Sequence, residues 1–248
     1  MRKRIRVVTP ITTVGLVNAK GYQAIAGPDT EISVVQIDRG PASIESEFDK
    51  MLAIPDTVFK IMEAEREGMD AVVINAMGDP GLHPARQVVS IPVVGPAEAT
   101  MHIASMLGHR FSVVTILGSV APMLGGLAKT YGVFDKLASA RWIGIPVLEL
   151  ETDPKRLVES LVQESITAIK EDGAHVIVLG CTGMFGLVEA VQSGLAQQGY
   201  GEIPVLDPIP VAIRMAEALV DLRLTHSKLA YPPPSDKRIV GFDVPARK

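Results

Sequence analysis

The chain is poor in several features on which protein functions commonly depend. Only one of its 248 residues is a cysteine, which excludes an internal disulfide and favours a cytoplasmic location. Aromatic residues make up only 4% of the chain. No apolar run reaches the roughly 18–20 residues of a membrane span, so we expect no membrane partner. The net charge of −4, without a basic stripe, argues against a nucleic-acid partner.

Signals for cofactors are equally scarce. The five histidines show no metal-ligand spacing with one another or with the cysteine, so we expect them to be structural or solvated. No glycine-rich phosphate-binding loop is complete, although Gly118-Ser119 and Gly125-Gly126 each offer a fragment of one. The sequence therefore contains no recognisable metal-binding or phosphate-binding motif, and we expect a small-molecule substrate.

The single cysteine lies in the most informative stretch, residues 174–184. An apolar, β-branched run there ends in a small-residue turn that contains Cys181, and a helical pattern follows. Such a strand–turn–helix places a side chain at the carboxyl end of a parallel strand, where open α/β folds bind ligands. Free N–H groups and the positive end of a helix dipole would lie close by, so we expect Cys181 to ionise more easily than a free cysteine. The alternative is a buried, inert thiol.

The chain also repeats itself. Residues 71–78 align with 176–183 at an offset of 105, and residues 4–9 align with 110–115 at an offset of 106. Two further pairs follow in the same order: 34–38 with 147–151, and 91–94 with 203–206. Four strand-like segments that recur in order indicate two copies of one α/β unit.

Strands alternate with helices in both copies. We predict strands at residues 4–9, 32–37, 71–75, 91–94, 111–116, 145–150, 175–179 and 203–206. We predict helices from Thr12 or Thr13 to about Ala26, and near 56–67, 83–89, 97–107, 120–131, 154–171, 184–198 and 209–222. This alternation predicts an α/β fold with two similar parallel-sheet domains. If a pseudo-twofold axis relates these domains, an active site is expected in the interdomain cleft.

The expected domain boundaries follow from the repeat. We assign residues 1–97 and about 208–248 to the first domain, and residues 98–207 to the second. The Pro-rich stretch from Tyr231 onward is irregular, and we expect it to pack on the surface or against a neighbouring subunit.

The repeat partner of Cys181 is Ala76. If a pseudo-twofold axis relates the copies, both turns face one cleft, and the two positions flank a bound molecule from opposite sides. A two-base racemase needs this geometry, because one group removes a proton from one face and another returns it to the opposite face. Alanine can do neither, and its alternative role is simple packing in a tight turn.

Other residues at the strand ends are candidates for substrate binding. In the turn after residue 77, the backbone N–H groups of Gly78 and Asp79 could donate to an anionic oxygen of a ligand. Alternatively, this is an ordinary turn in which Asp79 caps the following helix. Hydroxyls and backbone groups that could hold the polar edge of a ligand, or simply cap helices, occur at Thr9, Thr12, Thr13, Thr115, Ser119, Thr182 and Gly183. An apolar pocket could be lined by Ile11, Met77, Met123 and Met184, or these could be ordinary core residues.

Two of these turns resemble a known family. Residues 78–82 and 179–184 are similar to the two signature turns of the aspartate/glutamate/hydantoin racemase superfamily, and the hydantoin racemase branch fits best. Segments 40–45, 111–115, 145–150 and 206–208 also resemble that branch, and the similarity extends from about residue 4 to 222. The resemblance implies two α/β domains, an interdomain site, no metal or organic cofactor and a homo-oligomer. Amino-acid or allantoin racemases are alternatives within the same superfamily.

The resemblance also implies a pair of cysteines that act as acid and base. Cys181 matches the second of them, but the first falls at Ala76, where this chain departs from the pattern. The opening turn departs as well, because Thr9-Pro10-Ile11 stands where relatives often carry Asn-Pro-Asn. Three interpretations of Ala76 stay open: an impaired variant of a two-thiol hydantoin racemase, a single-cysteine enzyme similar to arylmalonate decarboxylases, or a non-catalytic small-molecule binding protein.

Overall fold

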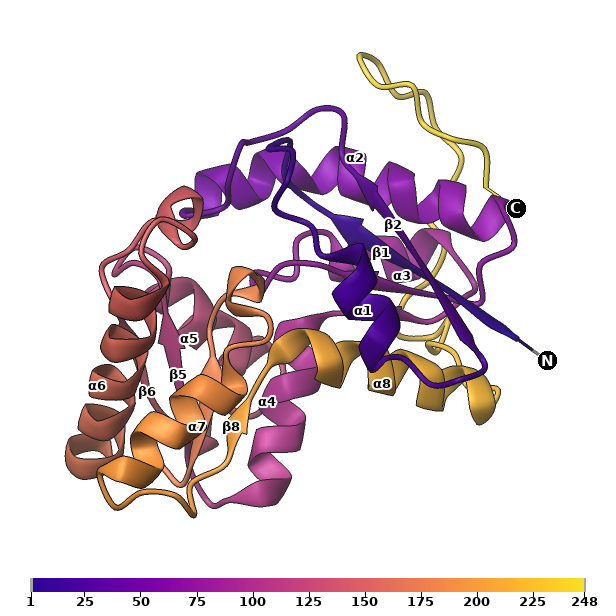
Figure 1. The fold of residues 1–248 in the computed structure, drawn as a ribbon. Helices are drawn as coiled ribbons and strands as arrows, with labels where there is room; N and C mark the ends of the chain where they lie inside the picture. The colour runs from indigo at the N-terminus through magenta and orange to yellow at the C-terminus, as the bar shows by residue number, and fades with distance from the viewer. Residues whose placement is uncertain (1, 248) are drawn as a thin grey trace.

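The computed structural model describes residues 2–247 and contains two parallel sheets of four strands each (Figure 1). The first sheet has the order β2-β1-β3-β4, with bounds β1 (Lys3–Thr9), β2 (Thr30–Gln36), β3 (Ala71–Ile74) and β4 (Val93–Val94). The second has the order β6-β5-β7-β8, with bounds β5 (Phe111–Thr115), β6 (Leu137–Trp142), β7 (Val176–Leu179) and β8 (Val205–Leu206). The predicted α/β class with two parallel sheets is confirmed.

The two sheets share their register as well as their strand order. In the first, Thr9 pairs with Gln36, and in the second, Thr115 pairs with Trp142. Both partners are offset by 106 residues (115 − 9 and 142 − 36). The repeat visible in the sequence therefore corresponds to a repeat of the fold.

One predicted strand is wrong. Residues 145–150 do not form the second strand of the second sheet, which is β6, and residues Val147–Glu149 form a short 3-10 helix, η2. The Ile-Pro-Val sequence at 145–147 imitates the one that leads into β4 and β8, whereas β6 lies at the sheet edge and its residues are only partly buried. An edge strand need not carry a continuous apolar run, so residues 137–142 show no distinct strand pattern.

The helices agree with the prediction in number and order, with two early differences. Their bounds are α1 (Ala19–Ile25), α2 (Glu47–Arg66), α3 (Leu82–Val88), α4 (Pro96–Leu107), α5 (Ala121–Thr130), α6 (Pro154–Asp172), α7 (Val188–Gln197) and α8 (Pro208–Asp221). Helix α1 begins late because Asn18, and not Thr12 or Thr13, caps it. Helix α2 begins early because the hydroxyl of Ser46 accepts the backbone N–H of Asp49.

The last helix of each half packs on the sheet of the other half. Helix α4 follows β4, yet its residues Ala97, Met101 and Ala104 belong to the core around β5 and β7. Helix α8 follows β8, yet it packs on β1, β3 and β4 with Ile209 and Ile213 among its buried residues. The two helices also contact each other, so they join the halves in the lower part of Figure 1.

The chain beyond α8 has no helix or strand up to residue 247. It passes over α3, where the Lys228 ammonium donates to the carbonyls of Arg86 and Val89. Further on it reaches α2, where the Phe242 ring lies 6.3 Å from that of Phe59. None of the helices within residues 2–247 has the length and apolar character to cross a membrane.

Candidate active site

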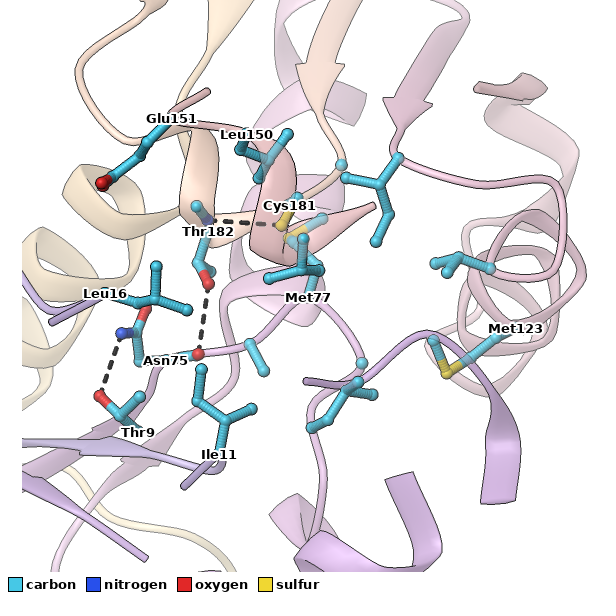
Figure 2. A pocket seen from close by; sticks show the side chains of 18 residues that line it. Thr9, Ile11, Leu16, Asn75, Met77, Met123, Leu150, Glu151, Cys181 and Thr182 are labelled. Carbon is cyan, nitrogen blue, oxygen red and sulfur yellow. Dashed lines mark hydrogen bonds between the residues drawn. The ribbon is translucent and has the colours of Figure 1, made fainter. Parts of the chain in front are cut away.

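A small cavity of about 90 Å³ lies between the two halves, at the carboxyl ends of β1, β3, β5 and β7 (Figure 2). Every central strand of both sheets therefore contributes to it. Its walls are formed by Thr9, Ile11, Leu16, Ile44, Asn75, Ala76, Met77, Gly78, Ile116, Val120, Met123, Val147, Leu150, Glu151, Gly180, Cys181, Thr182 and Gly183.

Cys181 stands two residues beyond the end of β7 and caps the 3-10 helix η3 (Thr182–Met184). Its sulfur accepts the backbone N–H of Gly183 at 3.4 Å. The preceding Gly180 is needed for this turn, because a Cβ there would lie 2.8 Å from the Cα of Thr115. The turn therefore holds the sulfur at the cavity wall.

The prediction that Cys181 has a lowered pKa is wrong. Desolvation by the surrounding protein raises the pKa of Cys181 to about 11, the Gly183 N–H lowers it, and the negative charge of Glu45 raises it. Helix η3 has three residues, and it offers only one N–H group to the sulfur. One hydrogen bond does not offset the loss of water, so the free protein holds a neutral thiol at pH 7.

Ala76 occupies the equivalent position in the first half. Ile74 pairs with Val8 and Leu179 pairs with Val114, so Ala76 and Cys181 each lie two residues beyond matching points of the two sheets. Both line the cavity. The hydroxyl of Thr182 donates to the backbone carbonyl of Asn75 at 3.2 Å, which links the two turns directly.

The cavity has one polar side. The side-chain amide of Asn75 donates to the hydroxyl of Thr9 at 3.1 Å and to the hydroxyl of Tyr22 at 3.2 Å. Thr182 adds a further hydroxyl beside them (Figure 2). This side could hold the amide-like edge of a ligand.

The opposite side is apolar. Met123 projects from α5 across the cavity from Asn75 (Figure 2) and lies against Gly78. The remaining apolar residues are distributed around the cavity: Ile11 and Leu16 lie beside Thr9 and Asn75 in Figure 2, and the others are Ile44, Met77, Ile116, Val120, Val147 and Leu150. An apolar substituent of a ligand would fit against this side.

A loop of the first half closes the cavity against the second half. The backbone carbonyl of Glu45 accepts the hydroxyl of Ser119 at 2.8 Å, and its carboxylate accepts the backbone N–H of Val147 at 2.8 Å. The adjacent Ile44 lines the cavity. These contacts hold the loop at residues 40–46 over the site.

Five residues predicted to bind substrate do not line the cavity. The hydroxyls of Thr12 and Thr13 donate to the carbonyls of Pro41 and Ala42, and that of Ser119 donates to the carbonyl of Glu45. Thr115 is fully buried and donates to the carbonyl of Gly180 at 3.0 Å. Asp79 is 4% exposed and accepts the N–H groups of Ala97 and Glu98 at the start of α4. Their polar groups are committed to the protein itself.

The other predicted residues are divided between cavity and core. Thr9, Ile11, Ala76, Met77, Gly78, Met123, Cys181, Thr182 and Gly183 are brought together around the cavity. Met184 is instead fully buried in the core. The backbone N–H of Asp79 donates to Ala76 and that of Gly183 to Cys181, so neither is available to a ligand.

The most informative residue that the sequence analysis missed is Asn75. It falls within the predicted strand 71–75, but a polar residue at the carboxyl end of an apolar strand is itself a signal for a ligand site. Leu16, Ile44 and Glu151 were missed because they lie in loops that only the folded chain brings to the cavity.

Asp79 fixes the turn that carries Ala76. Besides the two N–H groups of α4, its carboxylate accepts the hydroxyl of Tyr131 at 2.7 Å, from the end of α5. Burial raises the pKa of Asp79 to about 6, and these hydrogen bonds lower it. A raised folded-state pKa means that the contribution of this carboxyl to stability is complete below pH 3.8 and is lost as the pH rises through about 6.

We predict that Tyr131→Phe lowers the free energy of unfolding by about 1–3 kcal/mol, because it leaves the buried carboxylate short of one donor. The loss should be larger at pH 8 than at pH 4.5, since the hydroxyl stabilises the charged form of Asp79. Urea unfolding at both pH values measures it. Tyr200→Phe, on a partly exposed ring, is the matched control and should change stability little. Equal losses at both pH values would contradict the assignment.

The histidines do not form a metal site. His226 accepts the backbone N–H of Val93 at 2.9 Å, and burial lowers its pKa to about 4. The ring of His109 lies 5.9 Å from that of His175 at the far end of the second sheet. Among residues 2–247, no group of three or more His, Cys, Asp or Glu side chains is arranged to hold a metal ion.

Comparison with known proteins places this geometry in a family. Residues 5–216 match the model of the Asp/Glu/Hydantoin racemase family. A hydantoin racemase of Pseudomonas sp. (strain NS671) is 41% identical over 241 residues, which are 96% of this chain and 94% of that protein. The structure of allantoin racemase from Klebsiella pneumoniae has a TM-score of 0.89 at 36% identity and covers 96% of both chains.

A more distant neighbour shares the fold alone. The structure of an arylmalonate decarboxylase is 19% identical, has a TM-score of 0.63, and covers 88% of this chain and 92% of its own. The family match over most of the chain, the relative at 41% identity and the duplicated α/β architecture agree. The chain therefore belongs to the Asp/Glu/Hydantoin racemase family, a family of isomerases.

Proposed function

We propose that this chain binds 5-substituted hydantoins in the cavity and that Cys181 exchanges the C5 proton on one face of the ring. The observation that carries the proposal is the equivalence of Ala76 and Cys181, which end matching strands and line one cavity. A two-thiol racemase with its first thiol missing has this arrangement. The chain is then a racemase that retains only one of its two bases, and it needs no cofactor for the remaining step.

The two sides of the cavity support a hydantoin as the substrate. A hydantoin ring carries N–H and C=O groups that suit the side formed by Thr9, Asn75 and Thr182. Its C5 substituent would then lie against Met77 and Met123, which favours an apolar group over the polar ureido group of allantoin. The similarity to the Pseudomonas hydantoin racemase at 41% identity supports the same choice.

The chemistry requires the thiolate of Cys181 to remove the C5 proton and leave a planar enolate. Negative charge then develops on the neighbouring carbonyl oxygen and needs hydrogen-bond donors. Gly78 and Thr182 line the cavity, and their N–H groups donate to no acceptor within residues 2–247. We assign them this role, in place of the engaged N–H groups of Asp79 and Gly183.

The first test is exchange of the C5 proton in heavy water with D- and L-5-benzylhydantoin. One enantiomer should exchange faster than in buffer alone and keep its configuration, because the proton returns from the face that lost it. NMR and chiral chromatography measure the two quantities. Cys181→Ala should abolish the effect, with a loss of about 10²–10⁴-fold. Rapid racemisation of both enantiomers would contradict a single-thiol site.

The lone thiol favours a second candidate, decarboxylation of arylmalonates with Cys181 as the proton donor. The arylmalonate decarboxylase fold is shared, but at 19% identity it supports the fold alone. Loss of CO₂ from phenylmalonate, absent with Cys181→Ala, would establish this activity. Ligand binding that is indifferent to Cys181→Ala would instead indicate a non-catalytic binding protein.

A further inference from the structure

Asn75 contains a buried hydrogen-bond acceptor that the protein leaves unpaired. The residue is 7% exposed and lines the cavity beside Ala76. Its side-chain carbonyl oxygen, Oδ1, has no hydrogen-bond partner among residues 2–247. Most buried polar atoms are paired, so an unpaired oxygen on a residue that lines a cavity indicates a missing partner.

The protein engages the amide nitrogen of Asn75 and, among the described residues, leaves this oxygen free. The amide nitrogen of Asn75 donates to both Thr9 and Tyr22, which uses its two N–H groups. The ring of Tyr22 is held in turn by edge-on packing against Phe185, with the ring centroids 5.0 Å apart. Thr9 and Tyr22 are each 2% exposed, so neither can easily move away. The amide is oriented before any ligand arrives.

Thr9 adds the complementary group. Its hydroxyl oxygen accepts from Asn75, and its own proton is donated to no acceptor within the described residues. The cavity wall therefore offers one acceptor and one donor next to each other. A cyclic ureide carries the matching pair along its edge, an N–H beside a C=O.

We propose that Asn75 Oδ1 accepts a ring N–H of the substrate and that the Thr9 hydroxyl donates to the adjacent ring carbonyl, an assignment that rests on the proposed function. The pair selects ligands with an N–H next to a C=O. It also disfavours a carboxylate at this position, because the oxygens of the ligand would face Asn75 Oδ1 without a proton between them.

The test measures binding to the chain as it stands by calorimetry. The probes are 5-benzylhydantoin and its N1-methyl and N3-methyl derivatives. The chain should bind one of the two methyl derivatives about 10-fold or more weakly than the parent compound, because that methyl group replaces the recognised N–H. Asn75→Leu should weaken binding of 5-benzylhydantoin by a similar factor and should bind the affected derivative as well as the parent compound.

Thr100→Val is the matched control. The Thr100 hydroxyl is also buried and unpaired, but it lies in α4 and does not line the cavity, so this variant should bind all three probes like the starting chain. If Asn75→Leu does not fold, Thr9→Val takes its place, with the same expected loss.

The outcomes separate the two proposals. Equal binding of all three probes by the starting chain would overturn the assignment of Asn75 alone. A methyl effect that persists unchanged in Asn75→Leu would also overturn it, because the effect would then be steric. Failure of the starting chain to bind 5-benzylhydantoin at all would overturn both the assignment and the proposed function.

Discussion

Ala76→Cys is expected to raise the rate of hydantoin racemisation by about 10²–10⁴-fold, the usual contribution of a positioned acid or base. The substitution places a second thiol two residues beyond β3, at the position that matches Cys181 beyond β7. With a thiol on each side, a proton removed from one face can be replaced on the other. Both enantiomers then become substrates.

Chiral chromatography of D- and L-5-benzylhydantoin measures this gain directly. Ala76→Ser is the matched control, because a hydroxyl of similar size fits the turn but does not ionise in the accessible pH range. The serine variant should remain near the activity of the starting chain. If Ala76→Cys folds and binds substrate but racemises no faster, the two-thiol interpretation of the cavity is wrong.

The reactivity of Cys181 should rise about tenfold for each pH unit between pH 7 and about 10. Desolvation raises the pKa of the thiol to about 11, so only roughly one molecule in 10⁴ carries the reactive thiolate at pH 7. Both alkylation by iodoacetamide and C5 exchange depend on this thiolate. Their logarithms should increase in parallel with pH and level off near 11.

The unfolded chain supplies the control for alkylation. In urea the same cysteine regains a pKa of about 8.5, and it should react more than tenfold faster at pH 7 than in the folded protein. Saturating 5-benzylhydantoin should protect the folded protein further. If the alkylation rate of the folded protein instead levels off near pH 8, the pKa of Cys181 is not raised by burial and the prediction is wrong.

The fold could be predicted from the sequence where strands are buried on both faces. The apolar runs at β3 and β7 stand out because both faces of these strands are covered, and their similarity revealed the repeat. β6 was not predicted because the residues of an edge strand, such as Ser139 and Arg141, need not be apolar. Apolar sequence patterns indicate which residues are buried. They indicate strand pairing only where the paired strand is also buried.

The site could be predicted where function follows from position in a strand. Cys181 and Ala76 were found because the repeat aligns them. Asp79 and Thr115 occupy equally suggestive positions, but their side chains are engaged by the protein, and only the folded structure reveals those partners. The pKa of Cys181 could not be predicted either, since it depends on burial by the folded chain and on the negative charge of Glu45, which is distant in sequence.

The exchange of α4 and α8 between the halves has a consequence for how the chain folds. A fragment that ends before residue 108 would hold its own α4 but lack α8, the helix that covers β1, β3 and β4. The second half alone would lack the covering that α4 gives to β5 and β7. Neither half is therefore an independent folding unit, and the whole chain should unfold in a single cooperative transition despite containing two separate sheets.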